Sequence, residues 1–574
     1  MSKKMMLGNE AIARGAYEAG VKVVSAYPGT PSTEVSEAVV KYDGVYAEWA
    51  PNEKVAFEVA AGASVAGARS MVCMKHVGVN VAADPMFTCA YTGVNGGLVI
   101  LAADDPGMYS SQNEQDTRFY ARSAHIPMLE PSDSQEAKDF TKLAFDLSEK
   151  YDTPVFVRTT TRLAHSQNMV EECDRIDTPL KPYVKSVAKY TMMPAMAIAR
   201  HIAVEARERR LVDDINIDFE LNKVEMKGLE IGVVCSGIVY QYVKEALPNA
   251  SIFKVGMVYP LAINKVKEFA SKVKRLIVIE ELEPFFENQL KANGIVCEGK
   301  SLFSLQGEVT VAIIKEKILG EKLKIETLDL PVRPPVMCAG CPHRGVFYVL
   351  SKLKLTVNAD IGCYTLGAQA PLSAVDTVLC MGASIGMAHG FEKALGREQS
   401  KHEVAVIGDS TFIHSGITGL INAVYNKSNI TLIILDNSTT GMTGHQQHPA
   451  TGLTLANEPT KILNIVELCK VCGVDGLQVV DSYDLVAVEN AVKEELQRDG
   501  VSVVVCKRPC ALLTKHFPPA MRIENCKKCG MCSKIGCPAI EKQADGTVKI
   551  NASLCVGCGV CKSLCKFDAI KEGK

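Results

Sequence analysis

The chain has 574 residues, of which 47% are hydrophobic and 22% charged, the balance of a globular protein with several domains. Its formal net charge of -2 provides no basic surface for nucleic acid, and no apolar run reaches the roughly 18 residues of a membrane span. We therefore expect neither nucleic acid nor a membrane as partner. No apolar leader follows the N-terminus, which predicts a cytoplasmic protein.

The first predicted domain covers residues 1–165. Short apolar runs, such as those at 21–29 and 97–104, alternate there with helical stretches near 52–68 and 132–150. This alternation predicts a parallel sheet covered by helices, which is an α/β fold.

A connecting segment and a smaller domain are expected next. Residues 166–225 are mixed and charge-rich, with a predicted helix around 194–212. Over 226–330 we expect a small α/β domain, because three apolar runs there are typical of strands: 229–237, 252–260 and 275–281.

The second half begins after a proline-rich hinge. The sequence PVRPP at 331–335 opposes helix and favours extended chain. A third α/β domain is predicted over 336–515, and a cysteine-rich domain over 520–574. The small domain would thus lie between the two larger sheet domains in the chain.

The C-terminal domain contains eight of the 21 cysteines, in two C-x2-C-x2-C runs that are each followed by a fourth cysteine. Such spacing suits [4Fe-4S] clusters, and in two-cluster domains the fourth cysteine of each run binds the other cluster. Zinc is the alternative, since zinc knuckles also use C-x2-C pairs. The predicted ligand sets are Cys526, Cys529, Cys532 and Cys565, and Cys555, Cys558, Cys561 and Cys537. This tail resembles bacterial-type ferredoxin domains.

Two strand-like runs in the third domain end next to oxygen-bearing side chains. VAVI precedes Gly408 and Asp409, ITLIIL precedes Asn437, and apolar residues at helical spacing lie between them. If the strands are neighbours, Asp409 and Asn437 share one sheet edge and could hold Mg2+ with a diphosphate. An ordinary α/β domain with an acid after a strand remains the alternative.

The stretch from GDS to DN at 408–437 resembles the thiamine diphosphate signature. The resemblance implies that Asp409 and Asn437 bind Mg2+ through their side chains and Thr439 through its carbonyl group. It also implies that Gly408 and Ser410 bind the cofactor. Thiamine diphosphate acts as an electron sink when a 2-oxo acid loses CO2, which would give the tail its electrons.

The first domain contains matching motifs. YPGTPSTEV at 27–35 and the helix start at Glu53 resemble those of 2-oxoacid:ferredoxin oxidoreductases. The resemblance makes Glu53 the carboxylate that promotes the reactive form of thiamine, and it places Thr30 against the 2-oxo acid. The alternatives are a solvated first-turn acid for Glu53 and a simple strand-to-helix turn around Thr30.

Within that family, six motifs together resemble the alpha subunits of indolepyruvate:ferredoxin oxidoreductases: YPGTPSTEV, MKHVGVNVAADP, DDPGMYSSQNEQDTR, CAGCPHRG, IGCYTLG and GDSTFIHSG. The resemblance implies oxidation of aryl 2-oxo acids with coenzyme A to acyl-CoA and CO2. Electrons would pass to ferredoxin, and a smaller beta subunit would complete the enzyme. It implies a fold with two thiamine-binding sheet domains and a ferredoxin-like tail.

The residue that holds the substrate carboxylate stays open. Pyruvate-type relatives use an arginine without a secure equivalent here, and the candidates are Arg118, Arg122, Lys75 and His76. His76 joins Thr30 and Glu53 as a predicted catalytic residue.

A third cluster is an open possibility. Cys338 and Cys341 form a C-x2-C pair, and Cys363 and Cys510 occupy places comparable to those of relatives with a cluster near the thiamine. The alternative is four cysteines without a metal.

Two other functions stay in view at this point. One is a non-oxidative thiamine-dependent decarboxylase, which would release an aldehyde without coenzyme A. The other is a non-catalytic electron-transfer scaffold, although it would not need Glu53, Asp409 and Asn437 together.

Overall fold

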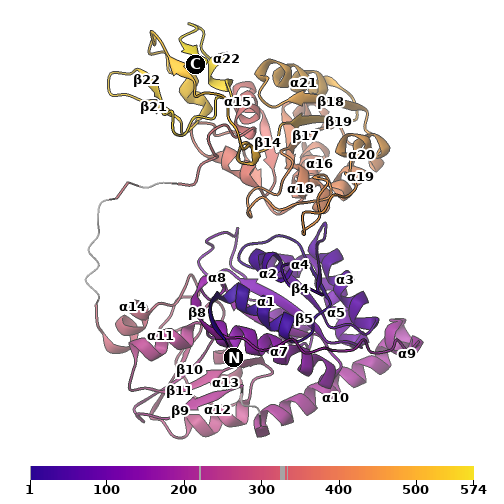
Figure 1. The fold of residues 1–574 in the computed structure, drawn as a ribbon, viewed down its shortest axis with the longest axis vertical. Helices are drawn as coiled ribbons and strands as arrows, with labels where there is room; N and C mark the ends of the chain where they lie inside the picture. The colour runs from indigo at the N-terminus through magenta and orange to yellow at the C-terminus, as the bar shows by residue number, and fades with distance from the viewer. Residues whose placement is uncertain (1, 219–220, 323–329, 332–333, 574) are drawn as a thin grey trace. The chain divides into compact units, whose positions relative to one another are not determined.

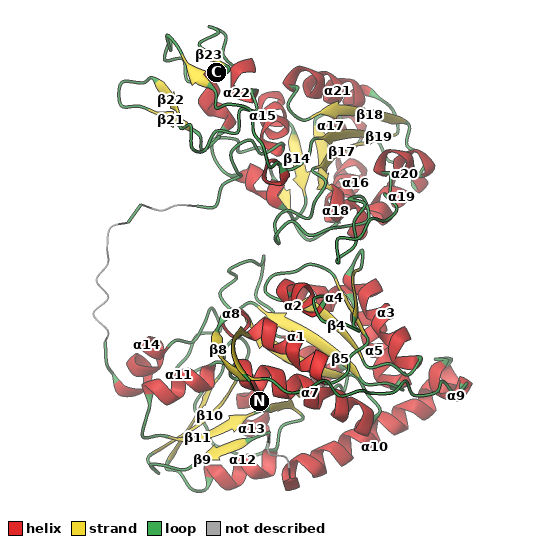
Figure 2. Ribbon diagram, in the orientation of Figure 1, coloured by secondary structure: helices red, strands yellow, loops and turns green. Residues whose placement is uncertain are grey.

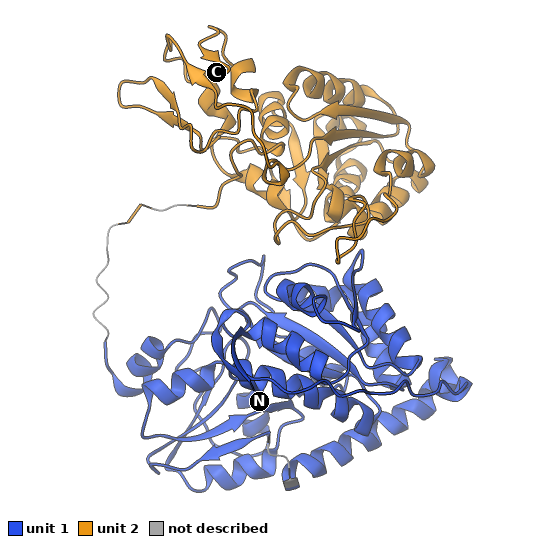
Figure 3. Ribbon diagram, viewed as in Figure 1, with its two compact units in different colours: residues 1–328 blue, residues 329–574 orange. Residues whose placement is uncertain are grey.

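The computed structural model describes residues 2–218, 221–322, 330–331 and 334–573 (Figure 1). The chain forms two compact units, residues 1–328 and 329–574 (Figure 3). Part of the predicted hinge, residues 332–333, lies outside the described residues. No helix in the described ranges is long and apolar enough to cross a lipid bilayer.

The first unit is built on a seven-stranded sheet with the order β12-β6-β7-β5-β4-β2-β3. All neighbouring strands run parallel except β12 and β6. The predicted parallel sheet is thus confirmed. Its strands are β2 Val23–Ala26, β3 Tyr46–Trp49, β4 Ser70–Lys75, β5 Leu98–Asp104, β6 Met128–Leu129, β7 Val155–Thr160 and β12 Met257–Tyr259.

Helices cover both faces of this sheet because its strands are apolar on both sides. In β4, Met71 and Cys73 pack on the side of α1 (Gly8–Glu18) and α7 (Ser134–Tyr151). Val72 and Met74 pack on the side of α3 (Glu53–Val65) and α5 (Ala83–Thr92). The helices predicted near 52–68 and 132–150 correspond to α3 and α7 (Figure 2).

A second sheet in this unit has the order β13-β10-β11-β9, from β9 Lys223–Glu225, β10 Ile231–Ser236, β11 Ser251–Val255 and β13 Arg275–Ile279. The strand expected over 252–260 is in fact two strands. β11 stays in the second sheet, whereas β12 pairs with β6 at the edge of the first. Side chains of both sheets also share one hydrophobic core, which includes Ile100 and Phe253.

The remaining elements of the first unit surround these sheets. The predicted helix around 194–212 is α10, Pro194–Asp218. The others are β1 Lys3–Leu7, α2 Thr33–Val39, α4 His76–Val81, α6 Thr117–Ser123, α8 Thr161–His165, β8 Gln167–Glu171, α9 Val187–Tyr190, α11 Val239–Ala246, α12 Ile263–Ala270, α13 Phe285–Ala292, α14 Val311–Ile314 and a π-helical turn, Lys315–Leu319.

The second unit contains a six-stranded parallel sheet with the order β15-β14-β16-β17-β19-β18. Its strands are β14 Thr356–Ala359, β15 Thr377–Val378, β16 Glu403–Gly408, β17 Ile430–Asp436, β18 Gly476–Asp481 and β19 Val501–Lys507. One face packs against α15 (His343–Leu353) and α21 (Leu485–Gln497). The other packs against α16 (Ala383–Leu395), α19 (Ile417–Tyr425) and α20 (Ile465–Val471).

The cysteine-rich tail belongs to the second unit and shares its core. Ile535 and Val560 pack with Phe347 and Leu350 of α15. The tail contains two antiparallel pairs, β20 Arg522–Ile523 with β23 Ile570–Lys571 and β21 Ile540–Lys542 with β22 Val548–Ile550, and the short helix α22 Val560–Ser563.

A buried ion-pair network joins the two sheets of the first unit. Arg118 is 1% exposed, and its guanidinium donates to Asp116 at 2.6 Å and to Glu280 at 2.7 Å. It also donates to the carbonyl oxygens of Glu281 and Glu283, at 2.9 and 3.0 Å. The segment after β13 is thereby attached to the loop that follows β5.

Arg118→Leu should lower the free energy of unfolding by about 3–5 kcal/mol, because it leaves two carboxylates buried without their partner. Trp49, the only tryptophan of the chain, lies in β3 and reports unfolding of this unit by fluorescence in urea. The control is Arg209→Leu, which removes an exposed pair with Glu205 and should cost less than about 1 kcal/mol. Equal losses of unfolding free energy in both variants would contradict a stabilising role of the buried Arg118 ion pairs.

Candidate functional site

Oxygen-bearing groups meet at one edge of the sheet in the second unit. β16 and β17 are parallel neighbours with Gly408 opposite Leu435, so Asp409 and Asn437 follow them at the same edge. The side-chain amide of Asn437 lies 2.9 Å from the carbonyl oxygen of Thr439 and 3.1 Å from Oδ1 of Asp409. We call these three residues the oxygen corner.

The orientation of the Asn437 amide decides what the oxygen corner can bind. With its nitrogen directed inward, Asn437 donates to both neighbouring oxygens. With its oxygen directed inward, three acceptors face one another without a proton between them, and a cation stabilises that arrangement. Carboxylate, amide and carbonyl oxygens are the ligands that Mg2+ prefers, so this donor set fits the ion.

The Asp409 carboxylate is held firmly at this corner. Its two oxygens accept hydrogen bonds from the backbone N–H groups of Ser410, at 2.8 Å, and Ser438, at 2.7 Å. The side chain is buried, and burial is the main cause that raises its pKa. Nε2 of His448 lies 3.3 Å from Oδ2 of Asp409. Two further histidines of this domain have other partners: His414 contacts Ser415, and His445 contacts Cys510.

A helix begins at Asp409 and continues to Tyr425. It consists of α18 (Asp409–Thr411), a π-helical turn (Phe412–Gly416) and α19. Ser410 accepts a hydrogen bond from Oγ1 of Thr440 at 2.8 Å. A Cβ atom on Gly408 would lie 2.5 Å from the Tyr364 ring, so packing alone requires glycine there.

The four cysteines of the possible third cluster are neighbours in the structure. Burial, and then the charges of Cys510 and Cys338, raise the pKa of Cys363 to about 11. Burial is also the main cause that raises the pKa of Cys341 to about 12, with further contributions from Cys363 and Cys510. Residues that lie far apart in sequence are therefore gathered at one place.

This cysteine group adjoins the oxygen corner. The backbone N–H of Cys510 donates to the carbonyl oxygen of Asn437 at 2.9 Å. Sγ of Cys363 lies 3.4 Å from the position that a Cβ atom would take on Gly441. A group held by these thiols would therefore lie next to a cofactor at the corner.

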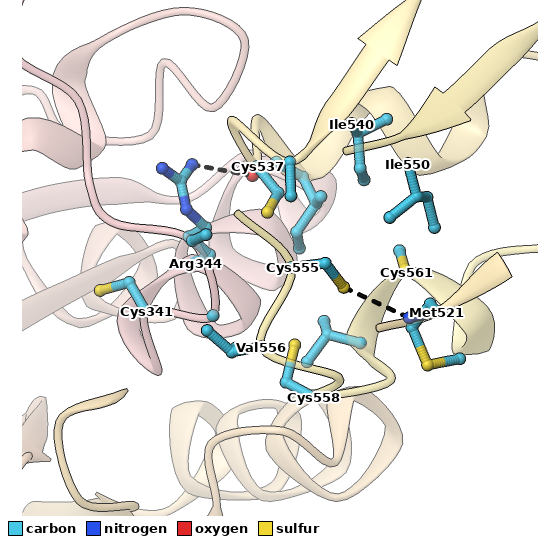
Figure 4. Close-up of a pocket in the computed structure, with 15 residues that line it drawn as sticks. Cys341, Arg344, Met521, Cys537, Ile540, Ile550, Cys555, Val556, Cys558 and Cys561 are labelled. Carbon is cyan, nitrogen blue, oxygen red and sulfur yellow. Dashed lines mark hydrogen bonds between the residues drawn. The ribbon is translucent and has the colours of Figure 1, made fainter. Parts of the chain in front are cut away.

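The tail cysteines surround two small cavities. Cys537, Cys555, Cys558 and Cys561 line one of them, together with Cys341 and Arg344 (Figure 4). Cys526, Cys529, Cys532 and Cys565 line the other. Each cavity thus has the four cysteines that the spacing rule groups together. In the part of the chain that is described, no three Cys, His, Asp or Glu side chains converge as ligands of a single metal ion.

Glu53 lies in the first unit at the start of α3. The helix is capped by Asn52, whose side chain accepts a hydrogen bond from the N–H of Val55 at 2.9 Å. The Glu53 side chain is buried, and a Cβ atom on Gly78 would lie 2.7 Å from its Oε1. The absence of a side chain at Gly78 therefore leaves space for the Glu53 carboxyl group.

Lys75 ends β4 close to both Glu53 and the Thr30 loop. Its stem packs against Gly29, and its Nζ donates to the carbonyl oxygen of Ser110 at 2.9 Å. Burial lowers the pKa of Lys75 to about 8, although Asp105 and Glu53 act to raise it. Ser110 also donates to the carbonyl oxygen of Thr30, at 3.2 Å.

The other candidates for holding a carboxylate differ in access. Arg118 is committed to its two buried ion pairs, and Arg122 is exposed on α6. His76 follows Lys75 and is buried, and burial lowers its pKa, so its ring is neutral near pH 7. Of the four candidates, Lys75 lies near Glu53, and His76 is the next residue in the chain.

Comparison with known proteins identifies the family. Residues 14–220 match the pyruvate flavodoxin/ferredoxin oxidoreductase thiamine-diphosphate-binding family, and residues 360–506 match the C-terminal TPP-binding domain of thiamine pyrophosphate enzymes. Residues 548–571 match the 4Fe-4S binding domain. The indolepyruvate oxidoreductase subunit IorA of Archaeoglobus fulgidus is 41% identical over 623 residues, covering 100% of this chain and 98% of that protein. This chain belongs to the IorA family.

A second relative accords with that assignment. Subunit IorA of Pyrococcus horikoshii is 40% identical, again over 100% of this chain and 98% of that protein. A solved 2-oxoglutarate:ferredoxin oxidoreductase from Magnetococcus marinus, with 2-oxoglutarate, coenzyme A and succinyl-CoA bound, is 19% identical with a TM-score of 0.48. It covers 55% of this chain and 65% of its own. This IorA-family chain is a thiamine-diphosphate-dependent 2-oxoacid:ferredoxin oxidoreductase with iron–sulfur clusters.

Three residues at these sites were not singled out from the sequence. Tyr364 packs against Gly408 and donates to Thr411 at 3.1 Å. Asp360, at the end of β14, accepts from the N–H groups of Gly382 and Ser384, at 2.7 and 3.0 Å. Arg344 lines the first tail cavity. A polar residue directly after a strand is a usable signal, but β14 was not predicted, so Asp360 was missed; no such signal existed for the other two.

Gly78→Ala should lower the rate of 2-oxo acid oxidation by about a hundredfold, because the added methyl group displaces the Glu53 carboxyl group. The assay is ferredoxin reduction, with the melting temperature as a check on folding. Gly62→Ala on α3, the helix that begins at Glu53, is the control, since a Cβ there meets nothing within 4 Å. Wild-type activity in the Gly78 variant would contradict a role of Glu53 in the reaction.

Proposed function

We propose that this chain oxidises aryl 2-oxo acids, indolepyruvate among them, to acyl-CoA and CO2 and passes the electrons to ferredoxin. This proposal rests on the full-length similarity to proteins named indolepyruvate oxidoreductase subunit IorA. The oxygen corner and the cysteine groups supply sites for the cofactors that such a reaction needs. Because the relatives are named as subunits, we further propose a smaller beta subunit as partner.

The oxygen corner is the proposed anchor of the coenzyme. Asp409, Asn437 and Thr439 would bind Mg2+, with Gly408 and Ser410 next to the diphosphate. Bound thiamine diphosphate supplies an electron sink for decarboxylation. Glu53 is the proposed carboxylate that promotes its reactive form; its burial and its place beside Gly78 support that role.

The tail cavities are the proposed sites of two [4Fe-4S] clusters. Their lining supports the ligand set Cys526, Cys529, Cys532 and Cys565, and the set Cys537, Cys555, Cys558 and Cys561. The grouping of Cys338, Cys341, Cys363 and Cys510 favours a third cluster over four idle thiols. Deprotonated thiols bind these clusters. The cysteine ligands therefore need to be shielded from bulk water and still be accessible to iron.

Lys75 is the proposed partner of the substrate carboxylate. It is buried beside Glu53, adjoins the loop that contains Thr30, and is not part of an ion pair among the described residues. Thr30 and His76 would complete the substrate surroundings. A neutral His76 can exchange a proton during the reaction, which suits the catalytic role predicted for it.

The proposed function is tested with the chain purified anaerobically together with its beta subunit. Ferredoxin reduction is assayed with indolepyruvate, phenylpyruvate, hydroxyphenylpyruvate, pyruvate and 2-oxoglutarate, with and without coenzyme A. The expected result is reduction with the aryl acids that depends on coenzyme A. Aldehyde release without coenzyme A, or a preference for pyruvate or 2-oxoglutarate, would contradict the proposal.

Asp409→Ala should abolish retention of thiamine diphosphate, because it removes one of three metal ligands, while the iron content of the tail stays unchanged. Thiamine by fluorescence after oxidation and iron by colorimetry measure the two losses separately. Asp481→Ala is a matched control, since Asp481 ends β18 and pairs with Arg508. Undiminished thiamine in the Asp409 variant would exclude the metal assignment.

Lys75→Met should raise KM for the 2-oxo acid by about tenfold or more, with a smaller change in kcat, because a charge-assisted contact to the carboxylate is lost. In the wild type, kcat/KM should fall as the pH rises through about 8, where the buried amine loses its proton. Arg122→Met, which removes an exposed cation on α6, is the control. An unchanged KM and a flat pH profile in this range would exclude Lys75.

A further inference from the structure

Arg344 is a buried cation that contacts two loops with cysteines. It lies on α15, three residues after Cys341, and is 5% exposed. Nε donates to the carbonyl oxygen of Cys338 at 3.0 Å, and Nη2 donates to that of Met337. Nη1 donates to the carbonyl oxygens of Ile535, at 3.3 Å, and Gly536, at 2.6 Å, which precede Cys537 in the tail.

Two other deeply buried arginines among the described residues are neutralised by acids, whereas Arg207 donates only to carbonyl oxygens. Arg118 pairs with Asp116 and Glu280, and Arg158 pairs with Asp104 and Glu130. Arg344 forms no ion pair with a carboxylate in the described part of the chain, and its hydrogen bonds go to carbonyl oxygens. Carbonyl dipoles satisfy its donors but carry no net charge.

A buried charge without a counterion is costly, so the negative charge has to come from another source. Four cysteines lie around Arg344: Cys341, Cys537 and Cys558 line the same cavity, and the carbonyl oxygen of Cys338 accepts from its Nε. Two of them belong to the proposed third cluster and two to the cluster of the first tail cavity. Arg344 lines that cavity together with Cys341 and Cys537.

We propose that Arg344 is a positioning residue with two effects on these two neighbouring clusters. It makes their reduction potentials more positive, and it fixes the distance between them. This inference rests on the cluster assignments of the proposed function. A positive charge near a cluster favours its reduced form, which is more negative by one electron, and therefore makes the potential more positive. The hydrogen bonds to both loops keep donor and acceptor at one separation.

The redox step that Arg344 assists is a one-electron transfer. A cluster held by Cys338, Cys341, Cys363 and Cys510 would lose one electron, and a cluster held by Cys537, Cys555, Cys558 and Cys561 would gain it. No bond forms or breaks, and Arg344 keeps its proton throughout. Its charge favours the electron on either cluster over an electron left on the coenzyme.

The test is an anaerobic redox titration of the full enzyme, with the midpoint potential of each cluster signal read by electron paramagnetic resonance. Arg344→Gln removes the charge and should shift at least one potential to a more negative value while the iron content stays at the wild-type level. Arg344→Lys keeps the charge and should restore that potential. Arg522→Gln, an exposed tail arginine paired with Glu524, is the matched control and should shift none.

Two results would overturn the inference: unchanged potentials in the Gln variant with full iron, or equal shifts in the Gln and Lys variants. If the Gln variant loses iron, the Lys variant decides. A full iron content and a wild-type potential in the Lys variant would support the proposed effect of the Arg344 charge. Loss of iron in the Lys variant would overturn the inference. A wild-type enzyme without iron would instead disprove the cluster assignments of the proposed function.

Discussion

The register of two parallel strands, β16 and β17, determines where this protein can hold a metal. Neighbouring strands lie about 4.8 Å apart, so the residues that follow Gly408 and Asp436 meet at one sheet edge. Asp409 and Asn437 are buried there, with the carbonyl oxygen of Thr439 facing the Asn437 amide. Because water has little access, a cation would stabilise three inward oxygens in a way that solvent cannot.

The same sheet places the cysteine groups. β19 is the next neighbour of β17, with Asp436 opposite Lys507, so Cys510 arrives beside Asn437 and donates its N–H to that carbonyl group. Cys338 and Cys341 precede α15, which packs on the same sheet, and Arg344 on that helix reaches the tail. The oxygen corner and all three cysteine groups therefore belong to one compact unit. The proposed electron path from the coenzyme to the tail would therefore lie within that unit.

Much of this was predictable because the signals were local. Apolar runs predicted the strands β16 and β17, and helical spacing predicted the helix between them, which contains α19. Helical stretches were also predicted where α3, α7 and α10 lie. The cysteine sets around the two tail cavities follow the spacing rule for two-cluster domains.

Other features depend on contacts between distant residues, and these could not be predicted. The run at 252–260 reads as one strand, but its second half pairs with β6 in another sheet. Arg118 looked available for a substrate, yet Glu280, 162 positions away, neutralises it. Arg344 follows a cysteine motif like any helical arginine, and only the fold brings Gly536 to it.

The most direct test of the account is to follow the electrons themselves. The anaerobic enzyme with its beta subunit is mixed with indolepyruvate in the absence of ferredoxin and frozen at successive times for electron paramagnetic resonance. The account predicts that signals of reduced [4Fe-4S] clusters appear while CO2 is released, with no other reductant present. Release of CO2 while every cluster stays oxidised would contradict it.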